Sequence, residues 1–466
     1  MDIITSLTQT NRWWITGKID DIFLYKTIRS EFEQIKALLG MERILSVIGP
    51  RRVGKSTLLL QTINFCLESG VEPGRILRLN ADDPTLFWDG ATIYDVIETY
   101  ASEILHENLN DLTERIYIFI DEIHVLKDWQ VWLKYYFDRK LKIKFIISGS
   151  SAAHLFEGSK ESLLGRIESV LILPLSFTQF ADFWNVYRND GKIGEFLSMS
   201  PSGSAYVKPE DFYNELTENH WRLKEYKPYV NKVLKEYLLY GGYPEYFTVQ
   251  NGALWQKRLV EDNIGQGLYR DIINVYNIKN PERLERLLYF VAANNGQDFN
   301  FKTIGDTINC DGETVSGYLS FLERAYFITV LNNYSSNAGK TIRKNRKLYV
   351  LDNGIVNALL RTPELSPTLE GGLIESCCVR DARGVCENNF WRSYYWREDG
   401  GEVDIVIDKG TGLLPVEVKY RNDPEAGGLN AFANKFKLKD SVRLIITKDL
   451  LDKRDNTISI PFWLCK

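Results

Sequence analysis

The sequence contains few of the residues that build metal clusters or disulfide frameworks. Its 466 residues include only four histidines and six cysteines, with no Cys-x-x-Cys pair and no matching His spacing. The cysteines are Cys66, Cys310, Cys377, Cys378, Cys386 and Cys465. This scarcity argues against a structural zinc site and against a disulfide-stapled secreted fold. We expect reduced, mostly packed thiols in a cytoplasmic protein.

Long apolar runs are also missing. No segment approaches the ~18 uninterrupted apolar residues that a membrane span needs. The first residues, MDIITSLTQTNRWW, lack a basic stretch followed by an apolar one. We therefore expect no signal peptide and no membrane partner.

Positive charge is not in excess, because 57 Lys and Arg face 62 Asp and Glu for a net charge of −5. This balance argues against a large, permanently basic nucleic-acid surface, although it allows a local basic patch. The stretch Lys340–Lys347 is one candidate, and its cations are Lys340, Arg343, Lys344, Arg346 and Lys347. It is either a solvated hairpin or a contact for the phosphates of a nucleic acid.

Strands and helices alternate through the first half of the chain. Continuous apolar strands are predicted within residues 42–48, 74–84, 115–126 and 142–150, and helical patterns separate them. Such an alternation favours a parallel sheet that is covered on both faces, hence an α/β fold class. The length is a prior for about three domains.

A phosphate-binding motif directly follows the first of these strands. The sequence GxxxxGK[ST] is matched by Gly49, Pro50, Arg51, Arg52, Val53, Gly54, Lys55 and Ser56, with Thr57 next in line. The motif also opens a helix, which is the context it requires. Backbone N–H groups and the helix N-terminus attract phosphate oxygens. Lys55 would reach the β- and γ-phosphates of ATP, and Ser56 would ligate Mg²⁺.

Two carboxylates end a later apolar strand in the stretch IYIFIDEIH. We expect Asp121 to hold the metal through its water shell and Glu122 to orient and activate the attacking water. The next strand ends in small polar residues, so Ser148 or Ser150 could contact the γ-phosphate or this water. Ordinary turn chemistry at a strand end is the alternative.

Arg166, in ESLLGRIESV, offers a guanidinium that could stabilise charge on the γ-phosphate in the transition state. It would act in its own chain or on a neighbouring copy, which would make the protein a homo-oligomer. The alternative is a structural arginine that pairs with a nearby carboxylate.

A second charged cluster lies in the hairpin GEVDIVIDKGTGLLPVEVKY near the C-terminus. Side chains alternate along a strand, so Glu417 and Lys419 share a face. A turn centred on 409–412 would place Asp404 directly opposite Glu417. Like charges there are unfavourable, and a divalent cation between them would relieve the repulsion. Lys419 would then orient or deprotonate a metal-bound water.

The pattern from about residue 174 onward is mostly helical. Between 281 and 331, a helix, a short helix, a turn, a helix and a strand give a winged-helix shape. Its expected recognition helix, DGETVSGYLSFLERAY, contains one Arg and three acids. Because base readers normally present Arg, Lys, Asn or Gln, we favour a packing role for this helix.

The chain resembles prokaryotic AAA-type ATPases that carry a winged helix and a restriction-endonuclease-like C-terminal domain of unknown function. The resemblance spans nearly the full length through GPRRVGKST, IDEIH, ISGSSA, LLGRI, LPLSFTQF, YGGYPEYF, LYRDII, VSGYLSFLERA, LDNGI, GGLIES and EVD…VEVK. Arg52 stands where many members have Gln. The hairpin resembles a PD-(D/E)xK nuclease core, whose upstream helix often adds a Glu at the position of Glu375. This resemblance implies the metal ligands Glu375, Asp404 and Glu417, with Lys419 as the catalytic lysine.

The resemblance implies an AAA-type P-loop ATPase domain (1–190), a helical lid or linker (191–278), a winged helix (279–350) and a nuclease-like domain (351–466). The leading hypothesis is a Mg²⁺- and ATP-dependent ATPase whose nucleotide state rearranges the C-terminal half. One alternative is an ATP-gated, metal-dependent nuclease acting on DNA or RNA. Another is a nucleotide-dependent switch that binds a protein or nucleic acid, with an inactive nuclease-like scaffold in which Lys419 neutralises the acids.

Overall fold

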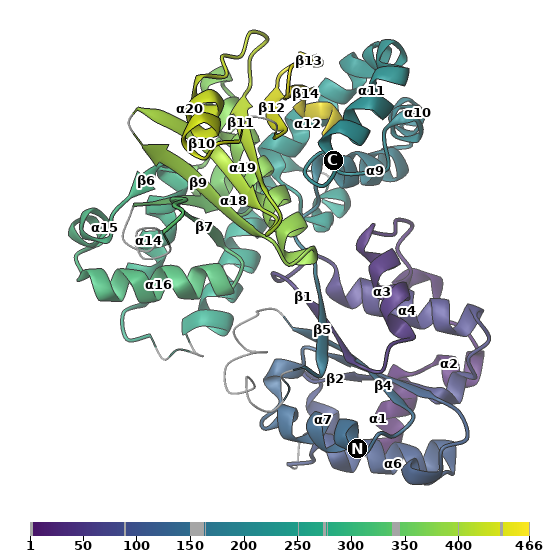
Figure 1. Ribbon diagram of the computed structural model, residues 1–466. Coiled ribbons are helices and arrows are strands. Elements are labelled where there is room, and N and C mark those ends of the chain that lie inside the picture. Colours follow the sequence, from purple (N-terminus) through teal and green to yellow (C-terminus); the bar gives the residue numbers. More distant parts are fainter. Residues whose placement is uncertain are drawn as a thin grey trace. The chain divides into compact units, whose positions relative to one another are not determined.

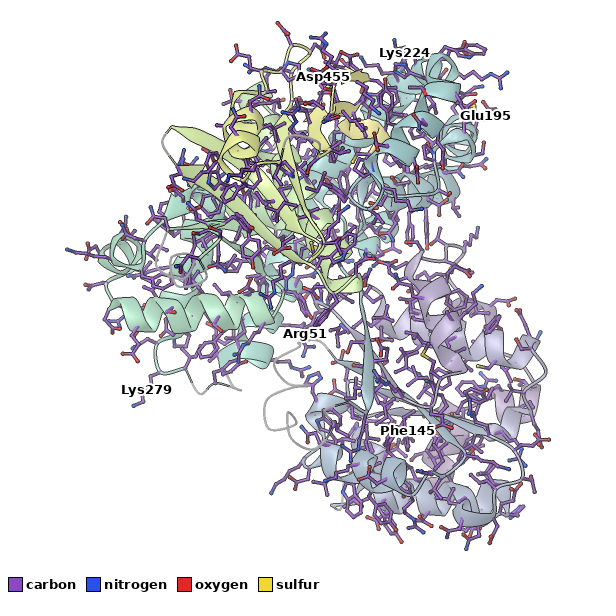
Figure 2. All side chains as sticks on the ribbon, in the orientation of Figure 1. Arg51, Phe145, Glu195, Lys224, Lys279 and Asp455 are labelled. Carbon is purple, nitrogen blue, oxygen red and sulfur yellow. The ribbon has the colours of Figure 1, made fainter. Side chains whose placement is uncertain are left out.

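The structure is a computed structural model that describes residues 3–87, 90–149, 163, 165–249, 251–273, 276, 278–337, 345–398, 400–438 and 441–465. The chain forms two compact units, Met1–Ile172 and Leu173–Lys466 (Figure 1). Charged side chains such as Glu195, Lys224, Lys279 and Asp455 extend from the surface, whereas Phe145 packs inside the first unit (Figure 2).

A five-stranded parallel sheet forms the centre of the first unit. Its order is β2-β3-β4-β1-β5. The strands are β1 (Ile44–Ile48), β2 (Ile76–Asn80), β3 (Ile116–Asp121), β4 (Ile143–Gly149) and β5 (Ile167–Leu171). The nearly continuous burial of β1, β3 and β4 explains the near-continuous apolar runs in the sequence, since both faces of the sheet are covered. The parallel sheet predicted from the sequence is therefore confirmed, and β5 is an addition to it.

Helices cover both faces of this sheet. Figure 1 shows α3 (Glu31–Leu39) and α4 (Lys55–Glu68) on one face, with α6 (Ile93–Tyr100) and α7 (Trp129–Asp138) on the other. Right-handed crossovers require this split, because the connection from β1 runs one way along the sheet and those from β2 and β3 run the other way. The remaining helices of the unit are α1 (Ile3–Thr10), α2 (Trp13–Thr16) and α5 (Pro84–Phe87).

The second unit begins with a helical region. Its helices are α9 (Phe177–Arg188), α10 (Gly191–Met199), α11 (Pro209–Leu223), α12 (Lys227–Tyr240) and α13 (Gly252–Arg258), and π-helical turns continue from α13 to Ile273. Helix α12 ends at Gly241, which has a positive φ of 79°. A Cβ atom on Gly241 would lie 2.1 Å from Asp352 Oδ1, so only glycine fits there. Asp352 also accepts a hydrogen bond from the Gly242 N–H, so the motifs YGGYPEYF and LDNGI pack against each other.

A three-stranded antiparallel sheet of order β6-β8-β7 follows, with three helices beside it. The elements in chain order are α14 (Pro281–Ala293), β6 (Asp298–Phe299), α15 (Phe301–Ile308), α16 (Gly312–Arg324), β7 (Ile328–Asn332) and β8 (Arg346–Val350). Helix α16 buries Val315, Tyr318, Leu319 and Leu322.

A six-stranded sheet ends the chain, in the order β13-β14-β12-β11-β10-β9. The strands are β9 (Arg392–Glu398), β10 (Gly401–Asp408), β11 (Leu413–Lys419), β12 (Arg443–Thr447), β13 (Asp452–Arg454) and β14 (Thr457–Pro461). Strands β9, β10 and β11 are antiparallel neighbours, whereas β11, β12 and β14 run parallel. The helices are α18 (Asn353–Leu360), α19 (Pro367–Asn388) and α20 (Gly427–Lys435). A core that includes Trp396, Val403 and Phe432 holds α20 on the sheet.

No helix in the described ranges is long and apolar enough to cross a membrane. The buried thiols of Cys66, Cys377, Cys378 and Cys386 form no disulfide, as expected from the cysteine spacing.

Candidate functional site

The loop 49–54 joins the end of β1 to the first turn of α4. Arg52 and Gly54 adopt left-handed conformations, with φ of 62° and 98°. Left-handed residues in a tight loop direct successive N–H groups to one side, which makes an anion-binding concavity. Gly49 is fixed for a different reason, because a Cβ atom there would lie 2.0 Å from the carbonyl oxygen of Ile172.

Lys55 is the first residue of α4 and is only 4% exposed. Its Nζ donates hydrogen bonds to the carbonyl oxygens of Gly49 at 3.0 Å and Pro50 at 2.8 Å. Ser56 follows in the same turn and is exposed, and Thr57 is half-buried. The Lys55 ammonium, which we predict to bind phosphate, and the Ser56 hydroxyl, which we predict to bind the metal, are therefore both next to the loop.

Arg29 supports the loop from the segment before α3, and the sequence motif does not include it. Its Nη1 donates to the carbonyl oxygen of Val53 at 2.7 Å, and its Nη2 pairs with Glu31 at 3.1 Å. Arg29 is 5% exposed. No local pattern marks this residue, because its role depends on a tertiary contact.

The acidic strand end lies at the same edge of the sheet as the loop. Asp121 is the last residue of β3, and the parallel register places Ser148 of β4 beside it. The Ser148 hydroxyl donates to Asp121 Oδ1, and it accepts from the Glu122 N–H at 3.1 Å. Arg78 Nη2 lies 3.2 Å from Asp121 Oδ2. Ser148 thus contacts the Asp121 carboxylate and the Glu122 N–H, and its contact to the γ-phosphate or the water stays a prediction.

Glu122 starts a sharp turn, with a φ of 52°. Its carboxylate lies 3.3 Å from His124 Nδ1 and is half-buried. Because β1, β3 and β4 are parallel and adjacent, their carboxyl ends bring the loop, Asp121 and Glu122 to one edge. A hydroxyl from Ser56 and the carboxylate of Asp121 are hard oxygen donors, and this donor set suits Mg²⁺.

Arg166 lies at the opposite edge of the sheet. Its carbonyl oxygen accepts from the N–H of Ile44 at 2.9 Å, at the start of β1, whereas the loop leaves the end of β1. Five strand residues separate these ends, a distance of roughly 16 Å at ~3.3 Å per residue. The guanidinium binds both oxygens of Asp138, at 2.8 and 3.1 Å. The structural pairing considered for Arg166 is therefore present, and Arg166 is distant from the loop of its own chain.

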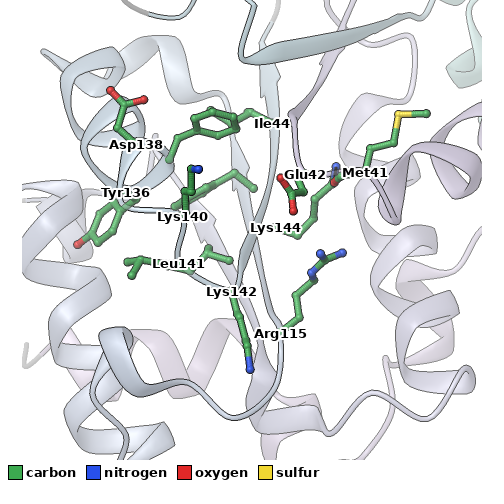
Figure 3. Close-up of a pocket in the computed structure, with 13 residues that line it drawn as sticks. Met41, Glu42, Ile44, Arg115, Tyr136, Asp138, Lys140, Leu141, Lys142 and Lys144 are labelled. Carbon is green, nitrogen blue, oxygen red and sulfur yellow. Dashed lines mark hydrogen bonds between the residues drawn. The ribbon is translucent and has the colours of Figure 1, made fainter.

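A pocket of about 330 Å³ lies at this same far edge (Figure 3). Lys144 is buried beside it and donates to the carbonyl oxygens of Leu38, Met41 and Arg43 at 2.6–2.8 Å. These carbonyls lie at and beyond the C-terminal end of α3, where a cation satisfies them. Burial, with a smaller contribution from Arg115, lowers the pKa of Lys144 to about 8. The pocket is a structural feature remote from the loop.

The C-terminal hairpin has the register that the turn predicted. Ile405 pairs with Val416, so Asp404 and Glu417 are the residues that directly follow the last pair of this register. Asp404 Oδ2 accepts from the Val418 N–H at 2.8 Å, and Lys419 Nζ lies 2.6 Å from Glu417 Oε1. Both carboxylates are buried, at 6% and 3% exposed.

Glu375 reaches the same place from α19, as the nuclease resemblance implied. Its Oε1 accepts from the hydroxyl of Tyr349 at 2.6 Å. Tyr349 is on β8 of the three-stranded sheet, so two modules of the second unit meet at these acids.

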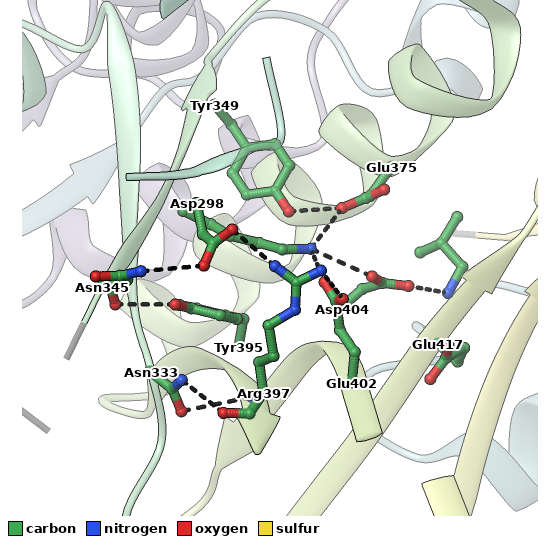
Figure 4. A network of polar contacts seen from close by, with 12 residues as sticks. Asp298, Asn333, Asn345, Tyr349, Glu375, Tyr395, Arg397, Glu402, Asp404 and Glu417 are labelled. Atoms are coloured by element: carbon green, nitrogen blue, oxygen red, sulfur yellow. Dashed lines mark hydrogen bonds and ion pairs between the residues drawn. The ribbon is translucent and has the colours of Figure 1, made fainter. Parts of the chain in front are cut away.

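Lys347 lies among the carboxylates, which corrects its placement in an exposed basic patch. It is 4% exposed, and its Nζ lies 2.6 Å from Glu402 Oε1, 3.3 Å from Glu375 Oε1 and 3.4 Å from Asp404 Oδ1 (Figure 4). Arg346 instead stacks on the ring of Phe301 at 4.6 Å. The prediction of a phosphate contact is wrong for Lys347, and Lys340, Arg343, Lys344 and Ser150 lie outside the described residues.

An outer ring of contacts joins the small sheet to the large one around these acids. Arg397 bridges Asp298 Oδ1 at 2.7 Å and Glu402 Oε2 at 2.8 Å. The hydroxyl of Tyr395 donates to the Asn345 carbonyl oxygen at 2.9 Å. Sequence reasoning missed Lys347, Glu402 and Arg397. Strand alternation could have indicated two of them. Residues two apart on a strand share a face, so Glu402 lies on the face of Asp404, and Lys347 lies on the face of Tyr349.

Burial and mutual repulsion shift the acids of this cluster. Burial, and then the nearby Asp404, raise the pKa of Glu417 to about 7. Burial and Asp404 likewise raise the pKa of Glu375. Burial alone would lower the pKa of Lys347, but Glu375, Asp404 and Glu402 outweigh it and raise that pKa above its ordinary value. Lys347 is therefore a firmly charged ammonium.

The acids only partly fit the metal centre that the nuclease resemblance implies. Carboxylates suit a hard divalent cation, and Glu417 Oε2 is buried without a hydrogen-bond partner in the described part of the chain. However, the described residues contain no group of three or more His, Cys, Asp or Glu arranged to hold a metal ion. The Lys347 ammonium contacts both Glu375 and Asp404 instead.

Family models match three consecutive parts of the chain. Residues 41–181 match an AAA domain, residues 231–366 match a domain of unknown function (DUF8612), and residues 370–464 match another (DUF4143). Together with the loop and the parallel sheet, the first match supports an AAA-type P-loop fold with a nucleotide-binding loop in residues 41–181. The second and third assign no activity.

Two relatives bear only the name uncharacterized protein. One from Methanocaldococcus jannaschii is 25% identical over 464 residues, which covers 96% of this chain and 93% of that protein. One from Haemophilus influenzae is 26% identical over 333 residues, covering 69% of this chain and 70% of that one.

Two solved structures show limited likeness. AMPPCP-bound DnaA from Aquifex aeolicus is 13% identical with a TM-score of 0.27, over 64% of this chain and 89% of that one. C. elegans PCH-2 is 13% identical with a TM-score of 0.24, over 41% and 48% of the two chains.

Proposed function

We propose that the protein is a Mg²⁺-dependent ATPase whose nucleotide state controls its C-terminal half. One observation carries this proposal: the loop with Lys55 and the acids Asp121 and Glu122 lie at one edge of the parallel sheet. That edge is where open α/β sheets bind their ligands.

The chain's own residues divide the work at this edge. Lys55 exchanges its two carbonyl partners for oxygens of the β- and γ-phosphates, and the loop N–H groups bind the phosphate chain. Ser56 and Asp121 would hold Mg²⁺, which supplies a positive charge that neutralises the phosphates. Glu122 orients the attacking water and accepts its proton. Ser148 and Arg78 keep the Asp121 carboxylate in place.

Nucleotide binding and turnover by the full chain test this proposal. Lys55→Ala should abolish both tight ATP binding and hydrolysis, because the loop loses the ammonium that would neutralise the phosphates. Glu122→Gln should keep ATP bound and lower kcat by about 100-fold or more. The proposal fails if Lys55→Ala hydrolyses ATP at the wild-type rate.

We assign the C-terminal half to a winged helix and a restriction-endonuclease-like domain, as the four-part division of the chain predicts. The helix–strand–helix–helix–strand–strand order with a β6-β8-β7 sheet supports the winged helix. The order α19, β9, β10, β11, α20, β12, with β12 parallel to β11, supports the nuclease-like core. The burial of four apolar residues on α16 favours packing over base reading for that helix.

A second candidate function is ATP-gated, metal-dependent cleavage of DNA or RNA. The observation that favours it is the convergence of Glu375, Asp404 and Glu417 beside Lys419. Incubation of either polymer with Mg²⁺ or Mn²⁺ tests it, with Asp404→Ala as the control. Equal cleavage by both proteins would reject this site. If neither cleaves while ATP is hydrolysed, the C-terminal half is a nucleotide-controlled binding module.

A homo-oligomer would give Arg166 a catalytic role. Its distance from its own loop leaves the loop of a neighbouring copy as the place where it could stabilise a γ-phosphate. The remainder of the Lys340–Lys347 segment is the proposed contact for nucleic acid.

A further inference from the structure

We propose that Lys347 is an internal cation that occupies the carboxylate centre in place of a divalent metal, so that metal binds there only after Lys347 leaves. This inference rests on the proposed nuclease-like site and concerns its regulation. It is independent of the ATP site in the first unit.

The contacts of Lys347 are those that a metal would need. Its Nζ lies against one oxygen each of Glu375, Glu402 and Asp404 (Figure 4). Asp404 Oδ2 already accepts from the Val418 N–H, so Lys347 takes the other oxygen of that carboxylate. A divalent cation requires such oxygens at ~2.0–2.6 Å, and the ammonium stands in that space.

Charge also opposes the presence of both cations. The cluster has four carboxylates, from Glu375, Glu402, Asp404 and Glu417, and three basic groups, from Lys347, Arg397 and Lys419. A metal ion bound to Asp404 would lie within a few ångströms of the Lys347 ammonium. Repulsion between such charges in a buried site is unfavourable, and it adds to the competition of the two cations for the same Glu375 and Asp404 oxygens.

The position of Lys347 makes this exclusion reversible. Lys347 belongs to β8 of the small sheet, whereas the acids belong to α19, β10 and β11. Polar contacts join the small sheet to the large one beside this cluster, and one of them, the Arg397–Asp298 ion pair, is half-exposed on the arginine side. Displacement of β8 would therefore withdraw one ammonium from three carboxylates at once.

A titration with Mn²⁺ on the nucleotide-free full chain tests this proposal. Binding is followed by the loss of the EPR signal of free Mn²⁺. We compare wild type with Lys347→Met, with Lys347→Met/Asp404→Asn and with Lys347→Arg, which keeps the charge. Lys435→Met is the matched control. Lys435 Nζ lies 2.6 Å from Glu398 Oε1 in the same sheet region, and both side chains are half-exposed.

We expect Lys347→Met to bind Mn²⁺ at least tenfold more tightly than wild type. The arginine variant and Lys435→Met should behave as wild type, and the added Asp404→Asn change should abolish the gain. Equal affinity of wild type and Lys347→Met overturns the proposal. Absence of binding in both overturns it together with the metal site, while unchanged ATP hydrolysis would leave the ATPase proposal standing.

A second measurement uses only wild type, in case Lys347→Met does not fold. Amine-reactive labelling, read by peptide mass spectrometry, should modify Lys347 at least tenfold more slowly than Lys435 without metal. Saturating Mn²⁺ should accelerate labelling of Lys347 and leave Lys435 unchanged. Fast labelling of Lys347 without metal, or no acceleration by Mn²⁺, overturns the proposal.

Discussion

Arg29 donates a hydrogen bond to the carbonyl oxygen of Val53 at 2.7 Å and so fixes the middle of the nucleotide loop. Arg29→Met should weaken ATP binding about tenfold, because the freed carbonyl and Glu31 lose a buried charged partner. Isothermal titration with ATP measures this change. Arg12→Met is the control, since Arg12 makes an exposed ion pair with Asp20 and should leave ATP affinity unaltered. Equal affinities in both variants would mean that Arg29 does not organise the loop.

Ser148 provides a second test, in which the turnover of ATP should change and its binding should not. Ser148→Ala removes the hydroxyl that donates to Asp121 and accepts from the Glu122 N–H. We expect kcat to fall about tenfold and the Kd for ATP to change less than twofold, because the phosphates do not depend on this hydroxyl. Ser198→Ala, on the exposed surface of α10, is the control. A parallel loss of binding would instead place Ser148 in direct contact with nucleotide.

Burial of Lys144 predicts the direction of a pH effect on stability. The folded pKa of about 8 lies below the unfolded value of ~10.4, so the unfolded chain binds more protons between these values. Stability should therefore rise by about 1–2 kcal/mol, after solvent screening, as the pH increases from 8 to 10. Denaturant midpoints of the full chain across this range measure the rise. The Lys144→Met variant should not show this rise. If stability increased equally with pH in both proteins, the effect could not come from the lowered pKa of Lys144.

Gly241 links two sequence motifs through a packing constraint. Gly241→Ala places a Cβ atom 2.1 Å from Asp352 Oδ1 at a φ of 79°, which should cost about 3 kcal/mol or more. Gly317→Ala is the matched control, because a Cβ atom on Gly317 in α16 would meet no heavy atom within 4 Å. That change should stabilise the chain by ~0.5–1 kcal/mol. Thermal unfolding of both variants measures the difference, and similar Tm values would argue against close packing at Gly241.

Local patterns predicted the parts of the fold that depend on local physics. Apolar runs predicted the parallel strands, and the turn 409–412 predicted the register that pairs Ile405 with Val416, next to Asp404 and Glu417. The loop at Lys55 was predicted because the residues of its motif are the ones that bind phosphate, and they are contiguous in the sequence. In each case, the residues that decide the geometry lie close together in the sequence.

Long-range contacts explain what the sequence did not reveal. Lys347 is 57 residues from Asp404, and its neighbours in the sequence made it part of a basic stretch. Contacts between the small sheet and the large one, such as the Asn333–Tyr395 bridge and the Tyr395–Asn345 hydrogen bond, place it among the acids. The sequence left Arg166 either catalytic or structural, because its place in the sheet depends on β5, which was not predicted.

The far-edge position of Arg166 leads to a test that needs two copies of the chain. Arg166→Ala should leave the Kd for ATP unchanged within about twofold, because the Arg166 backbone lies at the start of β1, roughly 16 Å of strand from the loop that leaves its other end. It should lower kcat by about 100-fold or more if neighbouring copies supply this residue to each other. A mixture of Arg166→Ala with Lys55→Ala should then recover activity, since one variant retains an intact loop and the other an intact arginine. Steady-state ATPase assays at several protein concentrations measure the recovery. Full activity of Arg166→Ala alone would make its pairing with Asp138 purely structural, and a mixture no better than the sum of its parts would exclude a role between copies.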